Sequence, residues 1–327
     1  FLPLLACSPK TTGTISKSAT ALSNWQAVAA PDNSKPVARH EAAFVRVKDK
    51  AYLLGGRGIR PVSILDLKTN TWTQGTKPPI EIHHFQPVVW QDEILLLGAM
   101  TGKYPGETPL PNFIIYNPER DEWRTGPEIP EGRRRGGAGS VLQDGKIYLV
   151  CGIVDGHRGG HVPWLDVYDL KNNTWQQLPD APRPRDHFQA VIHQDKLYSL
   201  AGRTTISSIN PFAHTIGEVD VYDMKTNTWS TLPDTLPTHR AGNAALVLNN
   251  DVLVVGGEST AHQEAHNEVE ALDTRTGTWR ALSPLSRGRH GTGVFYYQQK
   301  LVIASGCGNR GGSPELNDLL EVQIQKD

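Results

Sequence analysis

Two stretches decide the fold of this chain: residues 144–152 read DGKIYLVCG and residues 167–175 read VYDLKNNTW. The first predicts an apolar strand that ends in two small residues. The second predicts another strand, a tight turn at Lys171-Asn172-Asn173 and a Trp that opens a further strand. A Pro-rich turn follows the Trp, so the pattern indicates a unit of short antiparallel strands.

This unit recurs along the chain with a period near 50 residues. Six tryptophans mark it, separated by 47, 51, 52, 54 and 50 residues: Trp25, Trp72, Trp123, Trp175, Trp229 and Trp279. The pair of small residues recurs six times as well, at Gly55-Gly56, Gly98-Ala99, Cys151-Gly152, Ala201-Gly202, Gly256-Gly257 and Ser305-Gly306. The chain therefore contains six similar four-stranded units rather than the two domains that its 327 residues would suggest.

The units resemble kelch repeats over about residues 24–325. The resemblance implies an all-β fold, a six-bladed β-propeller, in a single domain at residues 23–327 that follows a segment at residues 1–22. The last unit has no Trp after Glu321, whereas Trp25 precedes the first complete unit. We therefore expect the strand at Trp25 to become the outer strand of the final blade and to close the ring.

The first residues of the sequence suggest where the protein is located in the cell. Leu4-Leu5-Ala6-Cys7 resembles a bacterial lipobox, which implies that residues 1–22 are a truncated lipoprotein signal peptide and a disordered linker. Lipidation of Cys7 would anchor the chain in the bacterial cell envelope, at the periplasmic face of the outer membrane or at the cell surface. The alternative is a buried N-terminal strand that contains a cysteine by chance.

Composition excludes several classes of protein. Hydrophobic residues at 38% and charged residues at 20% are typical of a soluble globular protein, and a net charge of -1 gives no global case for nucleic-acid binding. We expect no nucleic-acid partner and membrane contact only through the lipid anchor.

Three cysteines cannot build a disulfide framework. Cys151 is expected in a buried strand and Cys307 on the rim of the channel.

Alignment of the six units predicts a basic channel mouth. Five arginines occupy one column before the inner strand, at Arg39, Arg135, Arg185, Arg240 and Arg289, and the second unit has Ile82 at this position. The next two columns contain His40, His83 and His290, and then Glu41, His84 and His187. The column after the paired small residues adds Arg57, Arg203 and Glu258. Convergence of these arginines would favour an anionic ligand. The alternative is that each arginine binds carbonyls or carboxylates within the blades.

Long loops after the paired small residues are expected on the same face. Tyr104, Trp164 and Phe212 in these loops could stack on a sugar ring or pack against neighbouring loops. The loops also carry His157-x3-His161 and a second pair, His262 and His266. Loop spacing alone does not fix ligand geometry, so neither a metal nor another cofactor is expected.

Three functions are open at this point. Recognition of an acidic carbohydrate or similar anion ranks first, with ligand contacts from Arg57, His84, Arg135, Arg185, Arg203, Arg240, Arg289 and Trp164. The second is an enzyme acting on an acidic sugar, since the fold resembles the periplasmic N-acetylneuraminate mutarotases; Glu258 with His187 or His290 would be its acid and base. Glu258 is followed by Ser259-Thr260-Ala261-His262, which departs from that family's pattern. A protein-interaction scaffold ranks third, and a radical copper oxidase of the galactose-oxidase type is disfavoured.

Overall fold

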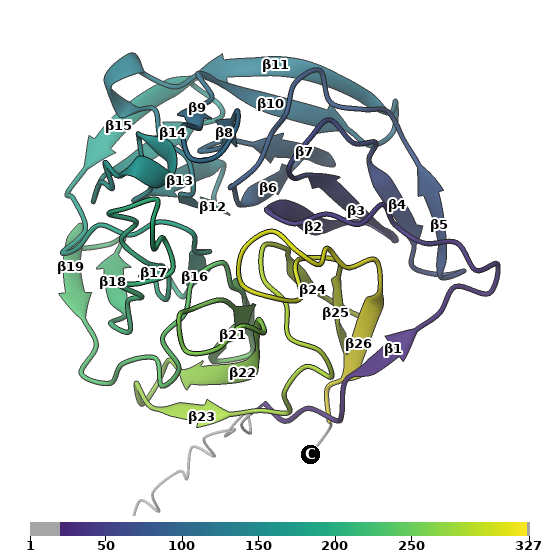
Figure 1. The fold of residues 1–327 in the computed structure, drawn as a ribbon. Coiled ribbons are helices and arrows are strands. Elements are labelled where there is room, and N and C mark those ends of the chain that lie inside the picture. Colours follow the sequence, from purple (N-terminus) through teal and green to yellow (C-terminus); the bar gives the residue numbers. More distant parts are fainter. Residues whose placement is uncertain (1–19, 326–327) are drawn as a thin grey trace, which may run out of the picture.

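The structure, a computed structural model, describes residues 20–325. Six four-stranded antiparallel sheets surround a central axis in the order of the chain (Figure 1). The predicted all-β fold and six-bladed propeller are therefore confirmed. The innermost strands β2, β6, β12, β16, β20 and β24 contact their neighbours around a complete circle.

Each blade runs from the axis outward through four strands, and five blades use consecutive segments of the chain. The first two blades contain β2 (Ala42–Val47), β3 (Lys50–Gly55), β4 (Ser63–Asp66) and β5 (Thr71–Gln74), then β6 (Pro87–Trp90), β7 (Glu93–Leu96), β10 (Asn112–Asn117) and β11 (Glu122–Glu128). The next two contain β12 (Gly139–Gln143), β13 (Lys146–Val150), β14 (Leu165–Asp169) and β15 (Thr174–Leu178), then β16 (Val191–His193), β17 (Lys196–Ser199), β18 (Asp220–Asp223) and β19 (Thr228–Thr231). The fifth contains β20 (Ala244–Leu248), β21 (Asp251–Gly257), β22 (His266–Asp273) and β23 (Trp279–Ala281).

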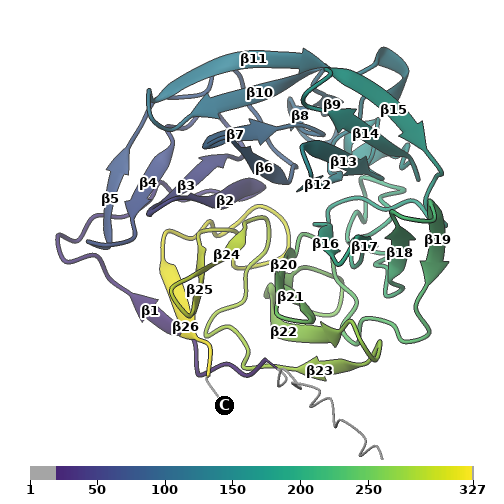
Figure 2. The same ribbon diagram turned by 180° about the vertical axis from the view of Figure 1, so that it is seen from behind.

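The sixth blade joins the two ends of the propeller. Its inner strands are β24 (Val294–Tyr297), β25 (Lys300–Ala304) and β26 (Leu319–Gln323), and its outer strand is β1 (Gln26–Val28), antiparallel to β26 (Figure 2). Trp25 is 3% exposed, and its Nε1 donates to the carbonyl oxygen of Ser283 at 3.1 Å. The predicted closure is confirmed. The packed segment starts earlier than the predicted boundary at residue 23, because Thr20 and Leu22 are already buried.

The apolar core lies between neighbouring blades. Alternate residues of each strand face opposite sides of the sheet, so each blade presents one apolar surface to the blade before it and one to the blade after it. One such cluster packs Leu253 and Val255 of β21 against Leu301 and Ile303 of β25. Residues 20–325 contain two short 3₁₀ turns, η1 (Glu131–Arg133) and η2 (Gly156–Arg158), and neither could span a membrane.

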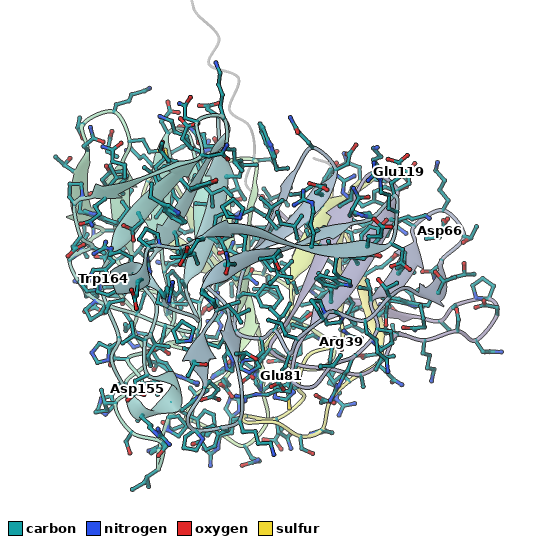
Figure 3. All side chains as sticks on the ribbon, turned by 90° about the horizontal axis from the view of Figure 1, so that it is seen from above. Arg39, Asp66, Glu81, Glu119, Asp155 and Trp164 are labelled. Atoms are coloured by element: carbon teal, nitrogen blue, oxygen red, sulfur yellow. The ribbon has the colours of Figure 1, made fainter. Side chains whose placement is uncertain are left out.

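The propeller has two different faces. Figure 3 shows Glu81 and Asp155 on one face, which carries the loops after the paired small residues, and Glu119 on the opposite face. The loop of the second blade adds a small hairpin to the first face, formed by β8 (Met100–Thr101) and β9 (Thr108–Pro109). This loop face contains the entrance to the central channel.

Candidate functional site at the channel mouth

A ring of backbone hydrogen bonds lines the channel at one position in each blade. The six residues are Glu41, His84, Gly137, His187, Gly242 and Gly291, and each has a φ between 53° and 66°. The N–H of His84 donates to the carbonyl oxygen of Glu41, and the same bond repeats from blade to blade until Ala42 donates to Gly291. This left-handed conformation suits glycine and is costly for other residues. Three blades nevertheless have a glutamate or a histidine here, so these side chains are placed at a cost of backbone strain.

Three imidazoles meet inside this ring. The ring centroids of His84 and His187 lie 4.6 Å apart. The ring centroid of His157 lies 5.2 Å from that of His84 and 4.9 Å from that of His187. His157 comes from η2 of the third blade, whereas His84 and His187 belong to the ring of the second and fourth blades. Burial lowers the pKa of His84 well below its ordinary value, and burial with the nearby Arg203 lowers the pKa of His187 to about 4. Both imidazoles are therefore neutral at pH 7.

Neighbouring acceptors fix the tautomer of each imidazole. The Nδ1 of His187 lies 2.5 Å from a carboxylate oxygen of Asp186, and the Nδ1 of His157 lies 3.0 Å from a carboxylate oxygen of Glu107. A carboxylate only accepts, so each Nδ1 carries a proton. A guanidinium only donates, and Nη2 of Arg203 lies 3.4 Å from Nε2 of His157, so this Nε2 is the acceptor. The Nε2 of His187 is buried and has no hydrogen-bond partner.

The tautomer of His84 follows from a short chain of contacts. The Nε2 of His83 lies 3.1 Å from the carbonyl oxygen of Gly102, and its Nδ1 lies 2.6 Å from the Nδ1 of His84. The carbonyl only accepts, so His83 carries its proton on Nε2 and accepts from His84 at Nδ1. His84 therefore has a lone pair on Nε2. That atom lies 2.6 Å from Oε1 of Glu41.

A buried ionic network surrounds the imidazoles. Glu41 accepts from the Nε of Arg57 at 2.6 Å, and Arg57 also donates to Glu107 at 2.5 Å. Arg203 donates to Oε1 of Glu258 at 2.7 Å and lies 3.8 Å from Asp186. The side chains of Glu107 and Asp186 are fully buried.

Glu258 contacts His290, one of the two histidines that sequence analysis offered as its partner. The Nε2 of His290 lies 3.3 Å from Oε2 of Glu258, and the N–H of Gly311 donates to the same oxygen at 2.8 Å. Burial raises the pKa of Glu258, but the charges of His290 and Arg203 outweigh it, and the pKa lies below its ordinary value. The Nε2 of His290 also lies 2.9 Å from the carbonyl oxygens of Asn309 and Gly311, which places its proton on Nε2 and leaves Nδ1 as the basic atom.

A cavity of about 570 Å³ opens above this floor. Glu41, His157, Arg203, Glu258 and His290 line its charged side. The apolar part of the lining comes from the loops of the second and fourth blades, with Tyr104, Ile209, Pro211 and Phe212. It adjoins the polar part, since the Tyr104 ring lies 4.9 Å from that of His157 and Cζ of Arg203 lies 5.4 Å from the Phe212 ring. His84 and His187 line the channel directly beneath, together with Glu41, Glu258 and His290.

The predicted convergence of the arginines is wrong for the column before the inner strand. Arg135, Arg185, Arg240 and Arg289 are at most 1% exposed and do not line this cavity, and neither does Arg39. Each donates to the carbonyl of the first paired small residue in its own blade, at Gly55, Cys151, Ala201, Gly256 and Ser305. Four of them also bind a carboxylate of the third strand or the loop before it, at Asp166, Asp220, Glu270 and Asp318. They hold the blades in shape.

Other predicted residues divide between the site and the scaffold. Arg57 and Arg203 line the cavity as expected, but both are already paired with carboxylates, so the mouth is not basic. Trp164 does not line it; its ring lies against Arg133, whose Cζ is 4.4 Å from the ring centroid. Cys307 is fully buried rather than on the rim, whereas Cys151 is buried as predicted. Cys7 lies outside the described residues.

Sequence analysis did not assign three members of the site. His157 was noted only as part of a loop motif, and Glu107 and Asp186 were not noted at all. Glu107 and His157 come from loops of different blades, and no spacing relates them. Asp186 precedes His187 in the chain, and this neighbouring acid was the one available signal.

Comparison with known proteins places the fold in a family. The KLHDC2/KLHL20/DRC7 kelch-repeats domain model matches residues 15–202 and 141–327. The chain belongs to the kelch-repeat family. This kelch propeller is 29% identical to the Kelch-like protein terF of Aspergillus terreus over 82% of the chain and 61% of that protein. It is 26% identical to Acyl-CoA-binding domain-containing protein 5 of Arabidopsis thaliana, and 25% identical to human Kelch-like protein 23.

These curated relatives are longer proteins. The kelch propeller covers 46% of the Arabidopsis protein and 44% of the human one, with 87% and 82% of its own length. Among solved structures, that of YjhT superposes with a TM-score of 0.74 and 16% identity, over 90% of this chain and 99% of YjhT. At this identity the superposition shows a shared fold.

Proposed function

We propose that this kelch propeller binds a small polyhydroxylated ligand of the carbohydrate class at the channel mouth and acts on it by proton transfer. The observation that carries the proposal is the contact of Glu258 with His290 at 3.3 Å, on the floor of a cavity with an aromatic wall. A carboxylate and an imidazole in contact are the usual groups of acid–base catalysis.

The mixed lining of the cavity suits the apolar and polar groups of a sugar. Tyr104 and Phe212 offer apolar surfaces for C–H groups, while the carboxylates and imidazoles of the floor offer partners for hydroxyl groups. A carboxylate ligand would have to displace Glu258 from Arg203, so this floor fits hydroxyl groups better than an anion. The acidic sugars predicted from the sequence are therefore the second candidates.

The test is exchange between the anomers of neutral and acidic sugars, followed by NMR. We expect the wild type to accelerate exchange and Glu258→Gln to bind the same sugar with a rate at least about 100-fold lower. Glu119→Gln, on the opposite face (Figure 3), is the matched control and should behave as the wild type. Equal rates for Glu258→Gln and wild type would contradict the proposal.

Phe212 provides a separate test of the aromatic wall. Phe212→Ala should weaken sugar binding by about 0.5–1.5 kcal/mol, the range for aromatic contacts. Ile209→Ser changes a side chain of the same wall that is 94% exposed, and it should have a smaller effect. If no sugar binds to the wild type, the hypothesis of a protein-binding scaffold would take precedence.

A second proposal concerns location: lipidation of Cys7 anchors the propeller in a bacterial envelope. Its support is the resemblance of Leu4-Leu5-Ala6-Cys7 to a lipobox. Detergent phase separation of the full-length precursor and of Cys7→Ala tests it. A wild type that stays in the aqueous phase would contradict it.

A further inference from the structure

We infer that Glu41, His84, His157 and His187 form a binding site for one divalent transition-metal ion at the base of the channel-mouth cavity. One donor atom from each of the four residues lies within 4.8 Å of all the others. Zinc binds imidazole nitrogen at about 2.0–2.1 Å, which would place neighbouring tetrahedral donors about 3.4 Å apart. Side-chain adjustments of about 1 Å therefore suffice to close the site around an ion.

The imidazoles are oriented as metal ligands are. The Nδ1 proton of His157 is bound by Glu107 and that of His187 by Asp186, while the Nδ1 proton of His84 is bound by His83. Outer partners of this kind fix the tautomer and the direction of ligating histidines. In each case the remaining lone pair lies on Nε2, and that of His157 faces Nη2 of Arg203 at 3.4 Å, a contact that a metal ion would replace. The Nε2 of His187 is buried without any partner, in a side chain that is 5% exposed.

The contact between His84 and Glu41 suits a cation. The Nε2 of His84 lies 2.6 Å from Oε1 of Glu41. With the proton of His84 on Nδ1, these two atoms repel each other unless a proton or a metal ion lies between them. A metal ion bound to both atoms would fill this position.

The charge of the surrounding network matches a divalent ion. Its buried or partly buried arginines and carboxylates are two guanidiniums, Arg57 and Arg203, and four carboxylates, Glu41, Glu107, Asp186 and Glu258. The histidines apart, the carboxylates exceed the guanidiniums by two, and buried charges are expensive unless they are paired. One divalent ion would balance this difference.

The donor set selects the class of metal. Three imidazoles and one carboxylate favour Zn²⁺, Co²⁺, Ni²⁺ or a similar first-row ion, whereas Mg²⁺ and Ca²⁺ prefer oxygen ligands. The inference does not depend on the ligand proposed above, because metal binding can be measured without any sugar. A second group, His262, His266 and Glu268, includes an exposed histidine and serves as the control.

The experiment uses the full chain after treatment with a chelator, with Zn²⁺ and Co²⁺ as probes. We expect one tightly bound Zn²⁺ per chain by calorimetry, and a visible Co²⁺ spectrum with nitrogen ligands. His187→Gly and His84→Gly should lose at least about 100-fold in affinity, more than the usual loss for an outer partner. Glycine already occupies this ring position in three blades, so both variants should fold, and circular dichroism checks this.

Two further variants make the result decisive. Asp186→Asn should weaken Zn²⁺ binding by about 10-fold to 100-fold, as expected for an outer partner. His262→Ala should bind Zn²⁺ as tightly as the wild type. Equal affinity for wild type, His187→Gly and His84→Gly would overturn the inference, as would loss of binding in His262→Ala alone or a wild type that binds neither ion.

Discussion

Arg185 donates from Nη1 to the carbonyl oxygen of Ala201 at 2.7 Å, and its Nη2 lies 2.6 Å from a carboxylate oxygen of Asp220. Both contacts lie inside one blade, and neither side chain of the ion pair is exposed. The same pattern recurs in the blades of Arg135, Arg240 and Arg289. Sequence analysis assigned this column of arginines to a ligand, but their hydrogen bonds and ion pairs stabilise the blades themselves.

Replacement of one of these arginines should lower the stability of the folded protein. Arg185→Ala leaves the carboxylate of Asp220 buried with one partner fewer, and we expect a loss of about 3–5 kcal/mol in the free energy of unfolding. Arg183 binds the other oxygen of Asp220 and is 28% exposed, so Arg183→Ala is the matched control, with an expected loss of about 1 kcal/mol or less. Denaturant unfolding measures both, and equal losses would contradict the assignment.

The closing strand gives a second prediction. Trp25→Ala removes a buried ring from the interface between the fifth and sixth blades, and we expect a loss of about 3–5 kcal/mol. Tyr296→Ala, in the sixth blade but 38% exposed, should change stability by about 0.5 kcal/mol or less. If both variants melt at the same temperature, β1 contributes little to closure.

Stability should fall in acid because of Asp251. Burial raises the pKa of Asp251, but hydrogen bonds from Arg280 and Thr20 outweigh it and hold the pKa below its ordinary value. A carboxyl with a lower pKa in the folded state stabilises the protein above its unfolded pKa, and this contribution is lost as pH falls through the folded pKa. Asp251→Asn should lower stability at pH 7 by about 1–3 kcal/mol and flatten the decline below about pH 4. Thermal unfolding across this range checks it, and parallel curves for the two proteins would refute it.

The two described cysteines should resist alkylation in the native protein. Burial raises the pKa of Cys151 and of Cys307 to about 11, and neither residue is exposed. The thiolate is the reactive form, so both sites should be labelled by iodoacetamide only after unfolding. Peptide mapping by mass spectrometry distinguishes them, and rapid native labelling of Cys307 would restore the sequence-based placement of this residue on the rim.

Alignment of the repeats identified part of the candidate site. Aligning the blades placed Glu41, His84 and His187 in one column, and the structure shows that this column lines the channel. Of the two histidines proposed as partners of Glu258, the structure places His290 in contact with it. The arginine column failed because an alignment tells which residues are equivalent, but not whether a side chain turns toward the axis or into its own blade.

The sequence by itself determined the repeat, the number of blades and the closure of the ring. The repeat and the number of blades depend on strand length, turn residues and a recurring Trp, which act within about 50 residues of one another. Closure followed from the same repeat, because the last unit lacks a Trp strand and the first segment supplies one. Only the tertiary structure decided that His157 and Glu107, from loops of two different blades, meet His84 and His187. Ring closure brings six separate loops to one axis, so the contacts among them depend on how the loops pack and not on any spacing along the chain.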